Sequence, residues 1–216
     1  MSTPIRIDIV SDVMCPWCII GWKQLERALG ATGHGATLRW HPFELNPDMP
    51  PEGQNLRDHL VEKYGTTEAQ SARTRAKMAA MGAELGFVFD FSDDMRMVNS
   101  FRAHQVIDWA GTLGHQHAMK MALFAAHFTE GRDVNDTGVL CDLAGRVGLD
   151  RDEAARVLAE GSHADSVREK QRFWAGQGIT GVPAMVFQQQ YLVTGAQGVE
   201  AYAQLLDRFA TQGAPA

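Results

Sequence analysis

The sequence predicts an α/β protein whose ends read β-α-β and β-β-α around a central mixed sheet, interrupted by a large all-helical insertion. Three observations support this fold class. Apolar residues alternate with period two near both ends of the chain, within 5–12 and within 183–194. A Cys-x-x-Cys pair, Cys15 and Cys18, directly follows the first of these runs. Between the two runs, from about 55 to 177, nearly every segment has the spacing and end signals of a helix.

The N-terminal segments are expected to form strand, helix and strand in that order. Residues 5–12 alternate and are rich in β-branched side chains, which favours a strand. The helix that follows the Cys pair ends near Gly30, where glycine and threonine replace the apolar residues. A second strand, 37–43, is closed by a segment rich in proline and aspartate.

The middle of the chain is expected to form an inserted helical bundle. Thr67 can cap a long helix, and Asp150 with Glu153 makes a start that resembles a capping box. The expected helices cover 56–64, 67–85, 98–110, 116–128, 136–147, 151–160 and 164–177. We therefore divide the chain into a sheet domain, made of 1–50 and 178–216, and a helical insertion domain, made of 51–177.

The C-terminal segments are expected to form a hairpin and a helix. The strands are 183–187 and 191–194, and the three glutamines between them make a tight turn. A last amphipathic helix begins near Val199 and places its apolar residues on one side.

The motif Cys15-Pro16-Trp17-Cys18 carries the strongest chemical signal. Two cysteines three positions apart on the first turn of a helix lie on one face. The unpaired N–H groups and positive dipole end of that helix stabilise a thiolate, and Pro16 fits there because its missing N–H would be unpaired. We therefore expect a redox pair in which Cys15 is the nucleophile, with a pKa below that of a free thiol. Cys18 is then the resolving thiol, and Trp17 shapes the site.

A metal site is the alternative interpretation of this motif. Zinc and iron–sulfur sites need about four ligands, usually with a second Cys or His pair. The third cysteine, Cys141, lies among apolar residues and is expected in a helical core. A site that also used His115 and His117 would span a long sequence gap. The position of the motif between a strand and a helix favours redox chemistry, so no metal is expected.

Charge and hydropathy exclude several kinds of partner. The formal net charge of −6 provides no basic patch for nucleic acid or anionic lipid. No apolar run approaches the roughly 18–20 residues that a membrane helix needs. We therefore expect neither a nucleic-acid partner nor a membrane partner. The strand pattern starts soon after Met1 without the features of a signal peptide, so we expect a cytoplasmic protein, where a cycling dithiol is favoured over a structural disulfide.

A second landmark, Gly178-Ile179-Thr180-Gly181-Val182-Pro183, lies just before the hairpin. With the Cys pair, it resembles the cis-proline loop of thioredoxin-fold proteins. Nearly the whole chain is similar to the DsbA-like thioredoxin family, specifically its FrnE-like branch, which is related to 2-hydroxychromene-2-carboxylate isomerases and kappa-class glutathione transferases. The resemblance implies a thioredoxin fold with a cis Val182–Pro183 bond beside the cysteines. A cis bond would leave the Val182 backbone free to pair with an extended substrate.

The resemblance implies a thiol–disulfide oxidoreductase, in which Cys15 attacks a substrate disulfide and Cys18 resolves the mixed disulfide. The isomerase and transferase relatives typically have serine where this chain has Cys15. A glutathione-dependent isomerase or transferase acting on a small aromatic or polyketide-like substrate is the first alternative, and a non-catalytic chaperone-like module is the second. The expected substrate is a disulfide-containing protein or a small thiol. We expect no bound cofactor, glutathione as a candidate cosubstrate, and a monomer or homodimer.

Six further residues are candidates for a ligand pocket: Phe43, Asn46, His104, Gly195, Ala196 and Gln197. His104 could orient a ligand carboxylate or tune Cys15, although a structural hydrogen bond is the commoner role for a lone histidine. Asn46 and the turn at 195–197 could hold a glutathione carboxylate, because helix starts bind anions, or could only cap the helix. Six methionines either line an apolar pocket or form plain core: Met78, Met81, Met95, Met97, Met119 and Met121.

Overall fold

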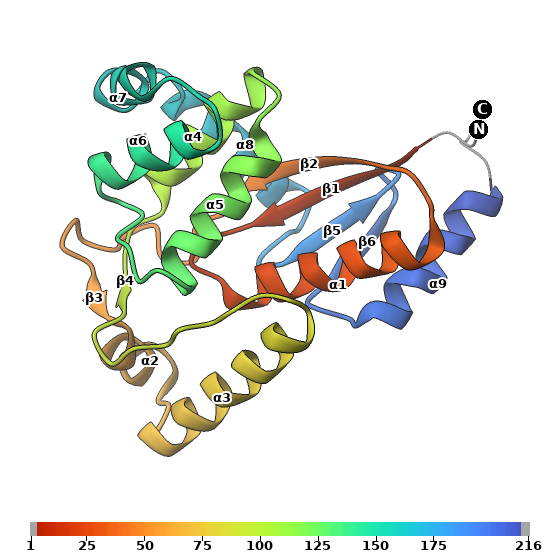
Figure 1. Cartoon of the computed structure of the whole chain (residues 1–216), viewed down its shortest axis with the longest axis horizontal. Coiled ribbons are helices and arrows are strands. Elements are labelled where there is room, and N and C mark those ends of the chain that lie inside the picture. The colour runs from red at the N-terminus through yellow and green to blue at the C-terminus, as the bar shows by residue number, and fades with distance from the viewer. Residues whose placement is uncertain (1–3, 213–216) are drawn as a thin grey trace.

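A four-stranded mixed sheet forms the centre of the protein, whose residues 4–212 are described by a computed structural model (Figure 1). The strand order is β2-β1-β5-β6. β1 (Ile5–Ser11) pairs in parallel with β2 (Ala36–Pro42) and antiparallel with β5 (Ala184–Phe187). β5 in turn pairs antiparallel with β6 (Tyr191–Thr194). The predicted order of strands at both ends of the chain is therefore correct.

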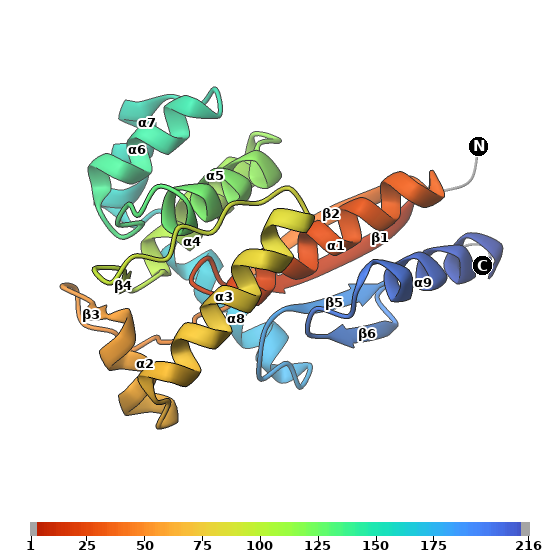
Figure 2. The same ribbon diagram turned by 60° about the horizontal axis from the view of Figure 1, so that its bottom comes forward.

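Two helices cover one face of the sheet. α1 (Pro16–Thr32) and α9 (Val199–Gln212) contact each other and lie side by side (Figures 1 and 2). Pro16 occupies the start of α1, where its missing N–H costs no hydrogen bond. Gly33 ends α1 in the left-handed conformation, with φ 71°, and its N–H donates to the Leu29 carbonyl. A side chain would strain that conformation, so glycine sets the length of the helix.

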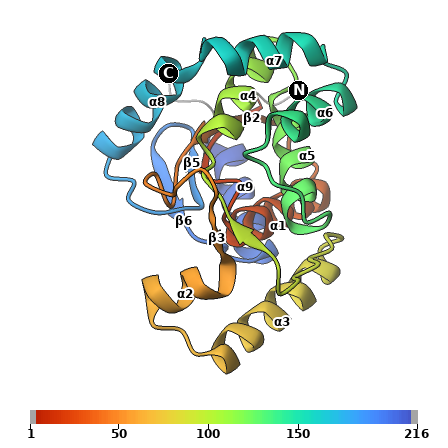
Figure 3. The same cartoon turned by 90° about the vertical axis from the view of Figure 1, so that its left-hand side faces the viewer.

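The insertion holds seven helices among the described residues, and they fall into two groups (Figure 3). α2 and α3 form an arm at one end, whereas α4 to α8 pack together beside the sheet. The helices are α2 (Leu56–Tyr64), α3 (Glu68–Glu84), α4 (Phe101–Thr112), α5 (Gln116–Phe128), α6 (Thr137–Arg146), α7 (Arg151–Glu160) and α8 (Ala164–Gly176).

The predicted helix starts at Thr67 and Asp150 are confirmed. Thr67 and Gln70 form a capping box for α3, and the Asp150 carboxylate accepts the Glu153 N–H at the start of α7. Two short strands, β3 (Gln54–Asn55) and β4 (Arg96–Met97), pair at the base of the arm and were not predicted. None of the helices in residues 4–212 is long and apolar enough to cross a membrane.

One hydrophobic cluster joins the sheet to the insertion. It includes Trp22 of α1, Trp40 of β2 and Phe124 of α5. The Trp40 ring packs edge-on against Trp22 at 5.6 Å and against Phe124 at 6.4 Å, measured between centroids. A second cluster is formed mainly by α4 to α7 and also includes Val13, Met14, Met97 and Val98. The division into two domains at 51 and 177 stays a prediction, and this shared core crosses the boundary that it draws.

Candidate active site

The Cys pair occupies the turn between β1 and α1, as its sequence context predicts. Both cysteines are free thiols, with Cys15 4% exposed and Cys18 0% exposed. The Cys15 N–H donates to the Asp12 carbonyl at 3.3 Å, and the Cys18 N–H donates to the Cys15 carbonyl at 3.0 Å. The Asp12 carboxylate accepts the Met14 N–H at 3.2 Å. These bonds fix the first turn of α1 and therefore the positions of both sulfurs.

The loop before β5 lies against Cys15. The Val182–Pro183 peptide bond is cis. Cys15 Sγ lies 3.7 Å from the Val182 carbonyl oxygen, within the range of a weak S–H hydrogen bond. Residues 167 positions apart in the chain thus meet at the site.

Two buried charged side chains, Asp12 and Lys120, lie near Cys18. Asp12 accepts the Leu45 N–H at 2.7 Å, and its other oxygen lies 3.5 Å from His104 Nε2. Lys120 is enclosed by protein, and its Nζ donates to the Ser11 carbonyl at 3.2 Å. The same Nζ lies 5.0 Å from the centroid of the Phe124 ring, a cation–π contact. The positive charge of Lys120 acts on Cys18, whose sulfur is enclosed by protein.

Burial and pairing shift the pKa values of both charged groups. Burial opposes ionisation of Asp12, but hydrogen bonding and charge from His104, together with the Leu45 N–H, lower its pKa below the usual value. Burial lowers the pKa of Lys120 to about 8, against the opposing influence of the Cys18 thiolate and Asp12. Lys120 can therefore hold or release a proton near neutral pH.

The two cysteines differ in pKa. The expectation that the pKa of Cys15 lies below that of a free thiol is wrong. Interaction with the Cys18 side chain, together with burial and repulsion by Cys18, raises the pKa of Cys15 well above that of a free thiol. Burial alone would raise the pKa of Cys18, but the neighbouring Cys15 and Ser11 side chains and the charge of Lys120 lower it. The Ser11 hydroxyl makes no hydrogen bond among residues 4–212. The first thiolate of the reduced pair therefore resides on Cys18, because its surroundings outweigh the helix dipole that favours Cys15.

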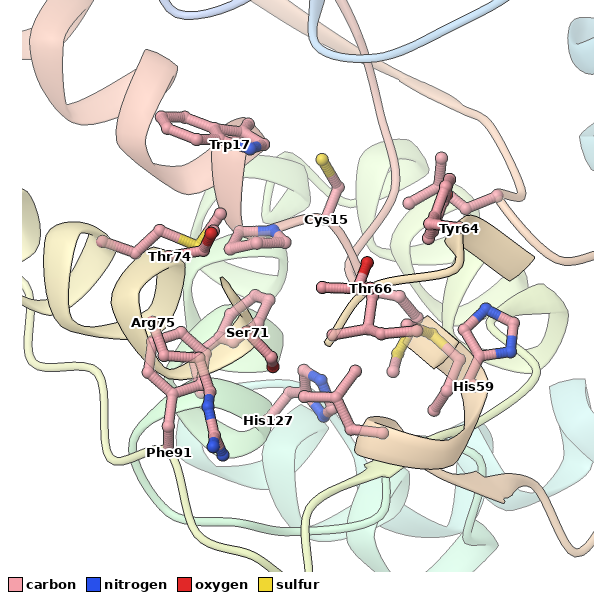
Figure 4. Close-up of a pocket in the computed structure, with 18 of the residues that line it drawn as sticks. Cys15, Trp17, His59, Tyr64, Thr66, Ser71, Thr74, Arg75, Phe91 and His127 are labelled. Carbon is pink, nitrogen blue, oxygen red and sulfur yellow. The ribbon is translucent and has the colours of Figure 1, made fainter. Parts of the chain in front are cut away.

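A cavity of about 380 Å³ lies beside Cys15, between the start of α1 and the arm formed by α2 and α3 (Figure 4). Most of its wall is apolar or aromatic. Cys15 and Trp17 form one end, and His127, Ser71 and Arg75 form the opposite end. The wall also includes Met14, Pro16, Leu45, Asn46, Leu56, His59, Leu60, Tyr64, Thr66, Thr74, Met78, Phe91, Met97, Phe128 and Val182.

Of the six candidates for a ligand pocket, only Asn46 lines this cavity, where its side chain accepts a hydrogen bond from Lys63. His104 is buried behind Asp12, and its Nε2 lies 2.8 Å from the Phe43 carbonyl oxygen. The Phe43 side chain packs in a separate apolar cluster. A ligand role for Phe43 and His104 stays a prediction.

The turn at 195–197 also lies outside the cavity wall. The Gly195 N–H donates to the Pro183 carbonyl at 2.8 Å, and Gln197 donates to the Thr194 carbonyl at 2.5 Å. Ala196 packs against the main core. These contacts tie the turn to the sheet. A role for the turn in binding glutathione stays a prediction.

The other polar and sulfur residues of the sequence divide between core and cavity. Cys141 is buried in α6, and His117 stacks on Trp40. The described residues contain no cluster of three side chains that could hold a metal ion. Met78 and Met97 line the cavity, whereas Met119 belongs to the core of α4 to α7.

One signal in the sequence pointed to the buried groups of the site and was overlooked. Lys120 and His127 are polar residues on the otherwise apolar face of α5, which includes Leu123, Phe124 and Phe128. A charged or polar residue on such a face is buried and needs a partner or a function. Ser71 carried no such signal, because serine is common on exposed helix surfaces.

Comparisons with known proteins agree with this geometry. A family model described as the DSBA-like thioredoxin domain matches residues 6–207. A probable DsbA oxidoreductase from Streptomyces coelicolor is 33% identical, has a TM-score of 0.92, and aligns over 98% of this chain and 92% of that chain. Protein YwbO of Bacillus subtilis, described as uncharacterized, is 25% identical over 199 residues, which are 92% of this chain and 94% of YwbO.

A more distant structure shares the fold. It is the cytosolic disulfide reductase DsbM from Pseudomonas aeruginosa with GSH, which is 18% identical, has a TM-score of 0.65, and aligns over 94% of this chain and 98% of that chain. Together these matches confirm the predicted fold over almost the whole chain.

Proposed function

Because this chain belongs to the DsbA-like thioredoxin family, we propose that it is a thiol–disulfide oxidoreductase in which Cys15 attacks and Cys18 resolves. One observation carries the proposal. The two thiols sit on the first turn of α1, where Cys15 borders a cavity and Cys18 is enclosed beside Lys120. Of the two thiols only Cys15 lines the cavity, so access through the cavity assigns the attacking role to Cys15.

The cycle balances as a two-electron exchange. The Cys15 sulfur attacks a disulfide RS–SR′, forming a Cys15–SR bond and releasing R′S⁻. Cys18 then attacks the Cys15 sulfur, forming the Cys15–Cys18 disulfide and releasing RS⁻. The dithiol has lost two electrons, and the substrate has become two thiols. Two molecules of a thiol such as glutathione return the enzyme to its dithiol form and become a disulfide.

The Cys18 thiolate is the base for the attack by Cys15. The Cys15 proton passes to the Cys18 thiolate as Cys15 attacks, because the pKa of Cys15 is raised and that of Cys18 is lowered. Cys18 must lose that proton before it resolves the mixed disulfide. Lys120, with a pKa of about 8, is near enough for its charge to act on Cys18 and is our candidate acceptor, together with Asp12.

Finer features of the function rest on indirect support. The DsbM relative is a cytosolic disulfide reductase solved with GSH, which supports glutathione as cosubstrate and a cytoplasmic reductase here. Assignment to the FrnE-like branch, a monomeric or dimeric state, and the choice between protein and small-molecule disulfides stay proposals. The direction of the reaction depends on the reduction potential of the pair against its compartment.

The cavity also favours the first alternative, a glutathione-dependent isomerase or transferase, because it offers an apolar space beside Cys15. A 2-hydroxychromene-2-carboxylate isomerase shares the fold at 14% identity and a TM-score of 0.70. The presence of Cys15 instead of serine favours disulfide exchange. Activity that needs glutathione and survives Cys18→Ser would identify the alternative.

Reduction of insulin and of glutathione disulfide, each driven by dithiothreitol, tests the proposal. We expect catalysis of at least one reaction by the wild-type protein and none by Cys15→Ser. A rate equal to that of the Cys15→Ser variant for both substrates would contradict it. Binding of an unfolded client that is indifferent to both cysteines would identify a chaperone-like module instead.

A further inference from the structure

The cavity beside Cys15 ends in polar side chains that nothing in the protein uses. His127 and Ser71 are 5% and 4% exposed, and both line the cavity. Among residues 4–212 no protein group hydrogen-bonds to the His127 ring or the Ser71 hydroxyl, and neither is among the unpaired polar atoms fully enclosed by protein, so both face the cavity. Their polar atoms lie in a wall that is mostly apolar, and a ligand that covers them must bond to them, because an unpaired buried polar group costs free energy. The two side chains are therefore available to bind a ligand that enters the cavity.

The third group at this end supplies positive charge. Arg75 lines the cavity, and its only ion pair in the described structure is a 3.8 Å contact with the exposed Asp93. Such a long, solvated contact leaves the guanidinium free to bind another anion. Figure 4 shows Ser71, Arg75 and His127 on the side of the pocket opposite Cys15. Burial lowers the pKa of His127 to about 4, so at neutral pH its ring can donate one hydrogen bond and accept another.

The rest of the cavity defines the body of the ligand. Its volume of about 380 Å³ lies at the low end of the range of small-molecule sites, roughly 300–1,000 Å³. Trp17, Phe91 and Phe128 provide ring faces and edges, and Met78 provides a polarisable thioether. Aromatic and thioether groups pack well against a flat apolar ring.

We propose that this cavity binds a small thiol or disulfide with a flat apolar body, its sulfur at Cys15 and a carboxylate at His127, Ser71 and Arg75. This inference rests on the proposed function, because it names the substrate class of the same site. His127 and Ser71 are then binding residues that set specificity, while the exchange step is the one described above, with the small disulfide as RS–SR′.

Binding of unreactive probes tests the site apart from its redox chemistry. The Cys15→Ser/Cys18→Ser protein is titrated by calorimetry with 4-(methylthio)benzoate and with thioanisole, which differ only in the carboxylate. We expect the carboxylate probe to bind at least about tenfold more tightly, the effect of about one charge-assisted hydrogen bond. In His127→Leu, a replacement of similar size, this preference should fall to about twofold or less. Equal affinities before the replacement, or no binding of either probe at millimolar concentration, would overturn the proposal.

Kinetics with a matched pair of variants test where the substrate lies. Ser71→Leu fills the cavity, and Ala72→Leu places the same side chain on the exposed neighbouring position of α3. The substrates are 5,5′-dithiobis(2-nitrobenzoate), a disulfide whose two halves are each a flat ring with a carboxylate, and bis(2-hydroxyethyl) disulfide. We expect Ser71→Leu to lower kcat/KM about tenfold or more for the first and about twofold or less for the second, with Ala72→Leu close to wild type. An equal loss for both substrates, or no loss, would overturn the proposal.

The two experiments separate this inference from the proposed function. If the wild-type protein reduces neither disulfide faster than the double-serine variant, but the probe preference depends on His127, the binding site stands and the oxidoreductase assignment fails. If disulfides are reduced while the probe preference is absent, only the inference fails. Circular dichroism and urea unfolding establish that each variant is folded, and Ser71→Val replaces Ser71→Leu if the latter does not fold.

Discussion

The two sulfurs of the Cys pair are three residues apart, but they face different surroundings. Cys18 is enclosed and lies near Lys120 and the Ser11 hydroxyl, so its neighbours govern the proton. Cys15 borders an apolar cavity that ends at His127, so its neighbours govern what can approach. The difference teaches that one helical turn can separate proton handling from substrate choice, because the thiol at the start of α1 borders the cavity and the thiol three residues later is enclosed.

The largest expected effect distinguishes the two cysteines by their roles. Cys15→Ser should lower disulfide exchange by about a thousandfold or more, because the attacking atom is lost. Cys18→Ser should instead stop the cycle after its first step, so that a mixed disulfide accumulates on Cys15. Mass spectrometry after incubation with a small disulfide detects this adduct. An adduct that forms on Cys18 in Cys15→Ser would reverse the assignment.

The next effect concerns Lys120, the cation near Cys18. Lys120→Met removes the charge that lowers the pKa of Cys18, so the pKa of Cys18 should rise. Each unit of that rise removes about tenfold of the thiolate at neutral pH, and the pH–rate profile should shift upward accordingly. The ratio of rates for flat and flexible disulfides should stay unchanged, because Lys120 lies outside the cavity wall. Lys77→Met, on the exposed side of α3, serves as the control. A changed ratio with an unchanged profile would contradict the separation.

A smaller effect, on stability, tests the burial of His127 in the cavity wall. Burial lowers the pKa of His127 from 6.5 to about 4, so between these values the unfolded chain binds the proton more strongly than the folded one. The free energy of unfolding should therefore fall as pH drops from 6.5 to about 4, by about 3 kcal/mol from this group.

Urea unfolding at pH 7 and pH 4 measures that contribution. His127→Leu should lose less stability between the two pH values than wild type. An equal loss in His127→Leu and wild type would show that His127 is not enclosed as described.

The smallest effect is expected at the turn that precedes α9. Gln197 donates to the Thr194 carbonyl and does not line the cavity. Gln197→Ala should change kcat/KM by no more than about twofold, equivalent to about 0.5 kcal/mol. A loss of glutathione-dependent activity well beyond that value would restore the binding role that the sequence suggested for 195–197.

Local signals explain which parts of the fold could be predicted. The strands at 5–11 and 184–194 alternate clearly, and Thr67 and Asp150 mark helix starts through their own side chains. β3 and β4 contain two residues each, too few for a periodic pattern, and only their pairing in space defines them. The shared core of Trp22, Trp40 and Phe124 likewise depends on contacts between distant segments, which sequence order does not encode.

The candidate site shows the same limit. The two cysteines and Val182 were predicted because their motifs are contiguous, and the structure brings them together. The pKa order of the cysteines was predicted wrongly, because it depends on Ser11 and Lys120 and not on the helix dipole alone. The polar end of the cavity depends on α3 and α5, whose meeting no local pattern encodes.

A titration of thiolate absorbance in the reduced wild-type protein and in both single-serine variants tests the central claim most directly. The account predicts a thiolate that forms below the pH typical of a free thiol in wild type and in Cys15→Ser, where the serine hydroxyl can still donate to Cys18. In Cys18→Ser, that early thiolate should be absent. An early thiolate that persists in Cys18→Ser and disappears in Cys15→Ser would contradict the account.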